Sequence, residues 1–428
     1  MRAIYKLLAL GVVLGAPLLA NADVLRIATW NLGWHISQQE LSPWITQCSK
    51  TYAKDTQGVW RLAPAGTPGA KQGWDISEPR VTLEGVDLSV MPPCAVYTTV
   101  ARKGIEVTKA SYSKRLTQIG RVLSSDVRPD VIAFQEVSGA QAVREALGPA
   151  SVDYNVCSFD SAYKVQRLAF AWKKALGNAV EACTDVKAMS LPQLAPEQRV
   201  RPGYVVTLNL RGKKVRLFTV HLKSGCVSSL EGDRLDGNVG ANDPCPILQQ
   251  QVQPLEEVWE QLPIGVDYFI VLGDFNRNLW HEANKVAGSE PVRSDSGTDL
   301  TTPRVSSVST RNLVLEVNDG VPASSKAILL SATCAGSADV VLACEASKTA
   351  KLITVQRQVL TASTGLGCRN PVGLDHVLVS QSLVASVKST SKVSIGSLGI
   401  SLAARPPQFV DPQLAISDHC PVVTEIEF

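Results

Sequence analysis

The sequence predicts a mixed fold of strands and helices, and three observations lead to that class. Short runs rich in β-branched and aliphatic residues alternate with stretches whose apolar residues recur at helical spacing. Hydrophobic residues make up 45% of the 428 residues, enough for a substantial core. We find no internal repeat, and a chain of this length can form one large domain or two.

The first 22 residues have the features of an export signal. Arg2 and Lys6 precede a 14-residue apolar run over 7–20, and Ala20-Asn21-Ala22 matches a small-x-small cleavage site. Because the run is short for a bilayer span, cleavage is favoured over a retained membrane anchor. Without Arg2 and Lys6, 40 basic residues face 39 acidic ones, so the formal charge falls from +3 to +1. Overall charge therefore does not indicate a nucleic-acid partner.

All ten cysteines follow this segment, and an even number in an exported chain predicts up to five disulfides. The pairs Cys226–Cys245 and Cys334–Cys344 are guesses, made because each brackets a turn-rich stretch. The alternative is that some of the cysteines stay free and buried. There is no CxxC pair, so a thiolate zinc site is not expected.

The predicted elements follow in chain order. A stretch rich in Pro, Gly and Trp over about 37–110 resembles a disulfide-tied insertion, and a second insertion is expected over about 280–370. Apolar residues at helical spacing predict helices from about residue 113, over 139–147 and over 248–262. Residues 211–214 read as a hairpin turn, and 287–312 as loop. Compact apolar runs predict strands over 24–30, 131–135, 205–210, 215–221, 268–272, 377–379 and 422–426.

Polar residues stand at the ends of these apolar strands. Asn31, Glu136 and His221 each come directly after one, and Asp274 and Asn276 follow another. Each residue alone is more often a turn or cap residue. Together, they predict a site where strand ends meet at one sheet edge. Two further acid–His pairs, Asp375-His376 and Asp418-His419, come late in the chain.

In this order, the motifs resemble the endonuclease/exonuclease/phosphatase superfamily, which includes deoxyribonuclease I-like enzymes and secreted bacterial nucleases. The matching segments are Ile27-Ala28-Thr29-Trp30-Asn31, Phe134-Gln135-Glu136-Val137, Thr219-Val220-His221-Leu222-Lys223-Ser224, Gly273-Asp274-Phe275-Asn276, Leu374-Asp375-His376 and Ser417-Asp418-His419. The resemblance implies an α+β fold, a four-layer α/β/β/α sandwich of two mainly antiparallel sheets flanked by helices, over residues 23–428.

The resemblance also implies roles. Asn31, Glu136 and Asp418 would hold a hard divalent cation, Mg²⁺ or Mn²⁺ with Ca²⁺ possible. Asp274 would activate the attacking water, and Asn276 would donate to the phosphate. His419, positioned by Asp375, and His221 would act as acid–base or phosphate-binding groups.

Arg167 and Lys223 are candidate substrate-binding residues, each with an ordinary surface role as the alternative. Gln166 departs from the family pattern, because deoxyribonuclease-like members often carry an acid there. His35 could line the cleft, but we expect a loop histidine without a catalytic role.

The leading functional hypothesis is a secreted or periplasmic metal-dependent nuclease acting on DNA or RNA. The first alternative is a phosphodiesterase or phosphatase for a lipid headgroup, phosphoinositide or small nucleotide, with Trp44, Trp60 and Trp74 as candidates for a lipid-facing loop. A non-catalytic binding or toxin-associated protein on the same fold is the lesser alternative. The sequence leaves protein partners unknown, and stable membrane insertion after signal cleavage is not expected.

Overall fold

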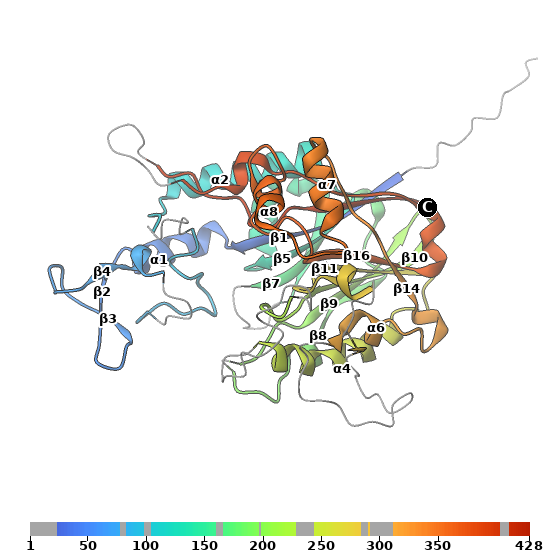
Figure 1. Cartoon of the computed structure of the whole chain (residues 1–428), viewed down its shortest axis with the longest axis horizontal. Coiled ribbons are helices and arrows are strands. Elements are labelled where there is room, and N and C mark those ends of the chain that lie inside the picture. Colours follow the sequence, from blue (N-terminus) through green and yellow to red (C-terminus); the bar gives the residue numbers. More distant parts are fainter. Residues whose placement is uncertain are drawn as a thin grey trace, which may run out of the picture.

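The computed structural model describes residues 24–77, 83–97, 104–159, 166–196, 198–227, 244–283, 290–291, 311–402 and 411–428, so the predicted signal segment lies outside the described residues. Two large mixed sheets lie face to face, with helices on both outer sides (Figure 1). Most strand pairs are antiparallel; the parallel ones in these sheets are β1·β5, β10·β11 and β15·β17. The predicted four-layer α+β sandwich is confirmed.

The seven-stranded sheet contains both ends of the described chain. Its order is β15 (Thr333–Cys334), β17 (Val387–Lys392), β18 (Val422–Glu427), β1 (Val24–His35), β5 (Val131–Val137), β7 (Arg167–Lys173) and β6 (Tyr154–Ser158). The six-stranded sheet has the order β14 (Ala327–Leu329), β16 (Asp375–Ser380), β11 (Tyr268–Asp274), β10 (Lys213–His221), β9 (Gly203–Leu210) and β8 (Glu181–Val186). The region of the second predicted insertion thus supplies an edge strand to each sheet.

Side-chain alternation along the strands separates three cores. On β1, Leu25 and Ile27 face the other sheet, whereas Ala28, Trp30 and Leu32 face the outer helices. The outer layer beside the seven-stranded sheet consists of α2 (Lys109–Val122), α3 (Ala140–Leu147), α7 (Ala338–Ala346) and α8 (Thr354–Thr361). The layer beside the six-stranded sheet consists of α4 (Cys245–Gln261), α5 (Leu279–Ala283) and α6 (Leu313–Val317). In the described part of the chain, no helix is long and apolar enough to cross a membrane.

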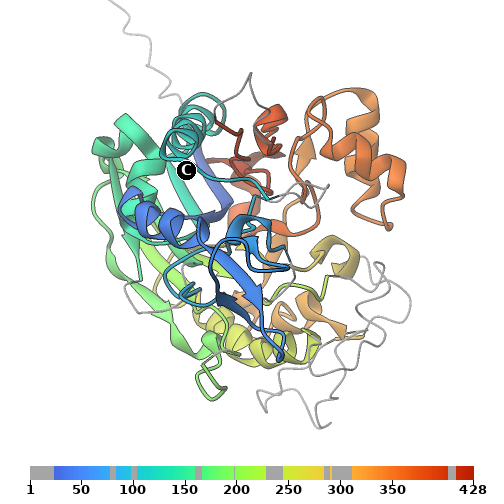
Figure 2. The same cartoon turned by 90° about the vertical axis from the view of Figure 1, so that its left-hand side faces the viewer.

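The predicted insertion over about 37–110 has its own small core. It contains α1 (Gln38–Cys48) and the three-stranded sheet of β2 (Thr51–Lys54), β3 (Trp60–Leu62) and β4 (Lys71–Gln72), and it projects from one end of the sandwich (Figures 1 and 2). Trp44, Trp60 and Trp74 are all buried there, and Trp44 packs edge-on against Trp74. These three residues therefore anchor the insertion and do not form an exposed apolar loop.

Four disulfides tie the described chain together: Cys48–Cys94, Cys157–Cys183, Cys334–Cys344 and Cys368–Cys420. The predicted Cys334–Cys344 bridge is confirmed. Cys226 is also disulfide-bonded, but the side chain of its predicted partner Cys245 lies outside the described residues.

Most of the predicted helices and strands are present, but their first or last residues differ from the predicted ones. The helix expected from residue 113 begins at Lys109, because Thr108 caps it by accepting a hydrogen bond from the Ser111 backbone N–H. The strand expected over 24–30 continues to His35, with a register shift against β5 after Asn31. Of the predicted 287–312 loop, the described residues show only a short parallel pair, β12 (Glu290–Pro291) and β13 (Arg311–Asn312).

Candidate active site

The strand ends meet at one edge of the sandwich because of how the strands pair. Parallel strands β10 and β11 end side by side, with His221 opposite Asp274. Strand β16 runs antiparallel to β11, so its first residue Asp375 also lies opposite Asp274. In the other sheet, parallel β1 and β5 bring Asn31 and Glu136 to the same edge. Residues 418–419 lead into β18, which pairs with β1.

Asp274 is the centre of this site. Asn31 Nδ2 donates to its Oδ2 at 3.0 Å, and the backbone N–H of Asn276 donates to its Oδ1 at 2.8 Å. His221 Nε2 and His419 Nε2 lie 3.5 and 3.8 Å from Oδ2. Burial, offset in part by His419, raises the pKa of Asp274 to about 7.

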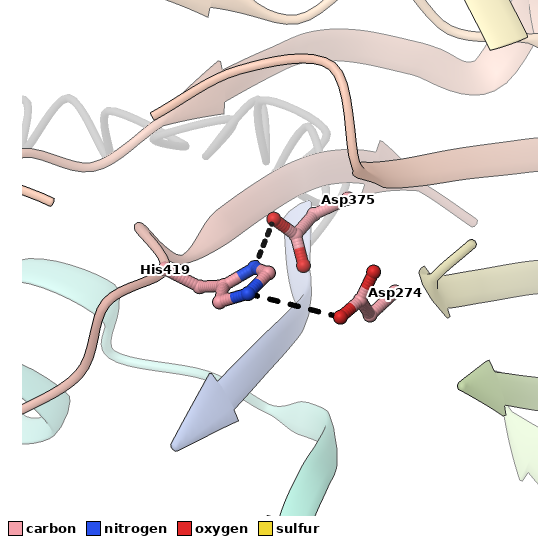
Figure 3. Close-up of side chains that lie close together, drawn as sticks. All are labelled: Asp274, Asp375 and His419. Atoms are coloured by element: carbon pink, nitrogen blue, oxygen red, sulfur yellow. Dashed lines mark hydrogen bonds and ion pairs between the residues drawn. The ribbon is translucent and has the colours of Figure 1, made fainter. Parts of the chain in front are cut away.

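His419 and Asp375 form a buried pair beside Asp274 (Figure 3). His419 Nδ1 lies 2.9 Å from Asp375 Oδ2, and both side chains are at most 6% exposed. Burial alone would lower the pKa of His419, but the carboxylates of Asp375 and Asp274 outweigh it and raise that pKa to about 10. His419 is therefore a cation near neutral pH and can donate from both ring nitrogens.

His221 is neutral by contrast. Arg201 Nη2 lies 2.9 Å from its Nε2, and because a guanidinium only donates, that nitrogen must accept. Burial, followed by the charge of Arg201, lowers the pKa of His221 well below its ordinary value. A second Arg201 nitrogen donates to Gln166 at 3.0 Å.

Arg201 was not predicted from the sequence, although one signal pointed to it. It precedes β9, which pairs antiparallel with β10, so the start of β9 lies beside the end of β10 that carries His221. Gln166 contacts both Arg201 and Glu136, and its hydrogen bond to Glu136 partly offsets the burial that raises the pKa of this carboxyl. The neutral residue that departs from the family pattern thus belongs to the site.

Glu136 and Asp418 lie close to the last part of β1, which follows Asn31. Glu136 Oε2 accepts from the Trp34 backbone N–H at 3.0 Å. A Cβ atom on Gly33 would lie 3.1 Å from Asp418 Oδ1, and its φ of 57° also favours glycine, so the end of β1 passes close to this carboxylate. Asp418 Oδ2 in turn accepts from Arg369 at 3.0 Å and Asn370 at 3.1 Å.

Backbone strain accompanies these residues. Glu136, Trp34 and Asn276 have positive φ angles of 56°, 54° and 51°, and the β5–β7 register shifts between Phe134 and Val137. Such conformations cost on the order of 1–3 kcal/mol each and occur preferentially at functional sites. Here they turn Glu136 and Asn276 toward the site at the ends of otherwise regular strands.

The residues on the Glu136 side suit a hard cation. Burial, and next the nearby Asp418, raise the pKa of Glu136. Two carboxylates and the Asn31 amide oxygen offer hard oxygen ligands of the kind that Mg²⁺ and Mn²⁺ prefer. Asp274, Asp375 and His419 also place one potential ligand atom each within 4.8 Å of one another. The His419–Asp375 hydrogen bond and the positive charge of His419 disfavour a cation there, so we favour the Glu136 side.

The two predicted substrate-binding residues belong to different sheets: Arg167 begins β7 of the seven-stranded sheet, and Lys223 follows β10 of the six-stranded sheet. Arg167, opposite Val137 in the sheet, lines a cavity of about 540 Å³ together with Met91, Ser138 and Gln141. Lys223 lies close enough to His221 for its charge to lower the pKa of that histidine. Asn276 Nδ2 donates to the Leu222 carbonyl at 3.0 Å, which ties it to the strand carrying His221.

A family model described as the Endonuclease/Exonuclease/phosphatase family matches residues 102–419, more than half of the chain. The chain belongs to this family. Its members are phosphoesterase hydrolases and generally depend on divalent metals. No curated protein matches the chain.

Solved structures that are similar to this chain include proteins with different activities. A humanized D. rerio TDP2 with 14 mutations is 12% identical, with 95% of this chain and 99% of that chain covered and a TM-score of 0.40. The 3'-5' exonuclease NExo of Neisseria meningitidis is 17% identical, with 74% and 96% covered and a TM-score of 0.39. A mannosyl-6-phosphatase of Bacteroides thetaiotaomicron is 14% identical, with 75% and 96% covered and a TM-score of 0.37.

Proposed function

We propose that this chain is an exported, divalent-metal-dependent phosphodiester hydrolase that cleaves nucleic acid. The observation that carries the hydrolase assignment is the meeting of Asn31, His221 and His419 around the buried Asp274 carboxylate. Four disulfides support export, because such bridges form in oxidising compartments.

The residues divide the chemistry among them. Asp274, whose pKa is raised to about 7, takes a proton from the attacking water. The His419 cation, held by Asp375, donates to a phosphate oxygen and can pass a proton to the leaving oxygen. Arg201, neutral His221 and Asn276 bind the phosphate. His221 is thus a phosphate ligand in this proposal, since its lowered pKa makes it a poor acid.

Glu136, Asn31 and Asp418 would hold Mg²⁺ or Mn²⁺. When bound, the cation supplies charge neutralisation at a non-bridging phosphate oxygen and at the leaving oxygen.

Cations on several sides of the site favour a polymeric phosphodiester. Arg167 lies opposite Val137, the residue after Glu136, Lys223 is close enough to His221 to affect its pKa, and the largely exposed Arg369 lies beside Asp418. A nucleic acid carries phosphates on both sides of the scissile bond, which these charges can contact.

The basic hairpin at 211–216 does not belong to this surface. It lies at the opposite end of β10 from His221, roughly 25 Å away at strand rise, and Lys214 and Arg216 pair with Glu181.

A cleavage assay tests this proposal. Purified protein with Mg²⁺ or Mn²⁺, with and without EDTA, is incubated with duplex DNA, single-stranded DNA, RNA, phospholipids, phosphoinositides and small nucleotides. We expect cleavage of at least one nucleic acid and complete loss of activity with EDTA. Release of inorganic phosphate or phosphocholine with all nucleic acids intact would replace the nuclease assignment with the phosphatase or lipid alternative. No metal-dependent cleavage of any substrate would favour a non-catalytic protein.

Replacing Glu136 with Gln should weaken metal binding without disturbing the fold. The variant removes one of two neighbouring negative charges, so we expect at least a ~10-fold higher Mn²⁺ concentration for half-maximal activity. Because burial and Asp418 oppose ionisation of Glu136, the metal-free melting temperature should not fall. Glu257→Gln, at an exposed position of α4, is the matched control. An unchanged Mn²⁺ activation curve for Glu136→Gln would contradict the ligand assignment.

The pH dependence of kcat/KM should follow the shifted pKa values of Asp274 and His419. Asp274 must be deprotonated to act as a base, so activity should rise with pH and level off near or below about 7, since a bound cation lowers this pKa further. His419 must stay protonated, and its pKa of about 10 keeps it so until the pH approaches that value. In Asp375→Asn, the descending limb should move to lower pH. A profile without a rising limb at any pH below about 7 at which the protein stays folded would rule out Asp274 as the base.

A further inference from the structure

A fully buried arginine lies behind the metal side of the site. Arg115 of α2 is 1% exposed. Its Nη2 donates to the carbonyls of Leu32 at 2.7 Å and Ile416 at 2.8 Å, and its Nε donates to that of Ala415 at 2.9 Å. Leu32 directly follows Asn31, and Ile416 is two residues before Asp418. One guanidinium therefore joins the two segments that carry these predicted ligands.

His35 extends this contact to the third segment. Arg115 Nη1 donates to His35 Nδ1 at 2.7 Å, so the ring proton must lie on Nε2, which is 3.2 Å from the Ala142 carbonyl in α3. The His35 carbonyl also accepts from the Ser138 backbone N–H at 2.8 Å. Ser138 and α3 follow Glu136 immediately. His35 is thus a buried histidine at the end of β1, not in a loop as expected, and it connects β1 to the segment of Glu136.

The insertion and α2 enclose the guanidinium. The rings of Tyr97 and Tyr112 lie 5.6 Å from its central carbon, and Tyr112 Oη donates to the Ile36 carbonyl at 2.8 Å. The hydrogen-bond partners of Arg115 in the described residues are backbone carbonyls and the His35 ring. A planar, rigid donor set of this kind fixes carbonyls from several segments at once, which a lysine ammonium does not do.

We infer that Arg115 is a positioning residue for the metal site. Together with His35, it fixes the spacing of the three segments that carry Asn31, Glu136 and Asp418. This inference rests on the proposed function, because it assumes that these three residues hold the cation. It also gives the predicted insertion a role, since Tyr97 of that insertion packs on the guanidinium.

Direct Mn²⁺ binding to the full chain without substrate tests the inference. Arg115→Lys should bind Mn²⁺ at least ~10-fold more weakly than the unmodified chain, as is typical for loss of an outer partner of metal ligands. Arg121→Lys, at an exposed position of the same helix, should bind within about twofold. In Arg115→Ala, millimolar guanidinium, far below denaturing concentrations, should restore part of the affinity, with no such effect on Arg121→Ala.

The possible outcomes separate the two proposals. A folded Arg115→Lys variant that binds Mn²⁺ as tightly as the unmodified chain overturns the inference. An unmodified chain that neither binds Mn²⁺ nor cleaves any phosphodiester overturns the proposed function instead. Should both Arg115 variants fail to fold, His35→Leu keeps a similar volume and removes the connection to α3. A several-fold loss of Mn²⁺ affinity in that variant supports the inference, and no loss overturns it.

Discussion

Replacing Asp274 with Asn is expected to lower kcat by about 10³- to 10⁴-fold while leaving the protein folded. Asn has nearly the same shape. It can accept only one of the two hydrogen bonds that the carboxylate oxygens accept from Asn31 and the Asn276 backbone, and it cannot accept a proton from water. The loss should appear in kcat, because phosphate binding by Arg201 and His221 does not depend on the Asp274 charge.

The stability of this variant provides the second measurement. Burial raises the pKa of Asp274 from 3.8 to about 7, so in the unmodified protein its ionisation opposes folding as the pH rises through this interval. Asn removes that cost, and the metal-free melting temperature at about pH 8 should therefore equal or exceed that of the unmodified protein. Asp153→Asn, at an exposed position, should change neither property. Retained kcat in Asp274→Asn would exclude Asp274 as the general base.

Replacing His419 with Asn is expected to lower kcat by about 10²- to 10³-fold. The variant removes the cation that is hydrogen-bonded to Asp375 and close to Asp274. Asp375→Asn should have a smaller effect, about 10-fold, because His419 remains but loses the carboxylate that holds it in place and raises its pKa.

The double variant distinguishes a working pair from two independent residues. Since Asp375 acts through His419, the double variant should be no slower than His419→Asn alone. Single-turnover kinetics at saturating metal would measure all three variants. Losses that multiply would show that Asp375 has a separate role. His281→Asn, at a buried histidine of α5 that has no role in the proposed mechanism, is the control for a general effect of removing an imidazole.

The predicted site residues differ in how much the sequence could say about them. Asn31, Glu136, His221 and Asp274 each follow an apolar run, and the pairing of parallel strands brings such positions together whatever the details of the loops. Asp375 and His419 were predicted only through the family resemblance, because the contact between them crosses the two sheets and spans 44 residues. Arg201 was missed because a single arginine before a strand is not distinctive until its strand partner is known.

The sequence by itself determined the α+β class, several strands of the two sheets, the cysteine-rich frame and the set of polar strand ends, because these depend on local periodicity and residue type. Only the tertiary structure decided that the three tryptophans are buried, that Gln166 belongs to the site, and that Arg115 joins segments some 300 residues apart. It also decided the charge of each histidine: the same imidazole is a cation between two carboxylates at 419 and neutral beside a guanidinium at 221. The physical reason is that burial and charge depend on neighbours in space, which lie far away along the chain.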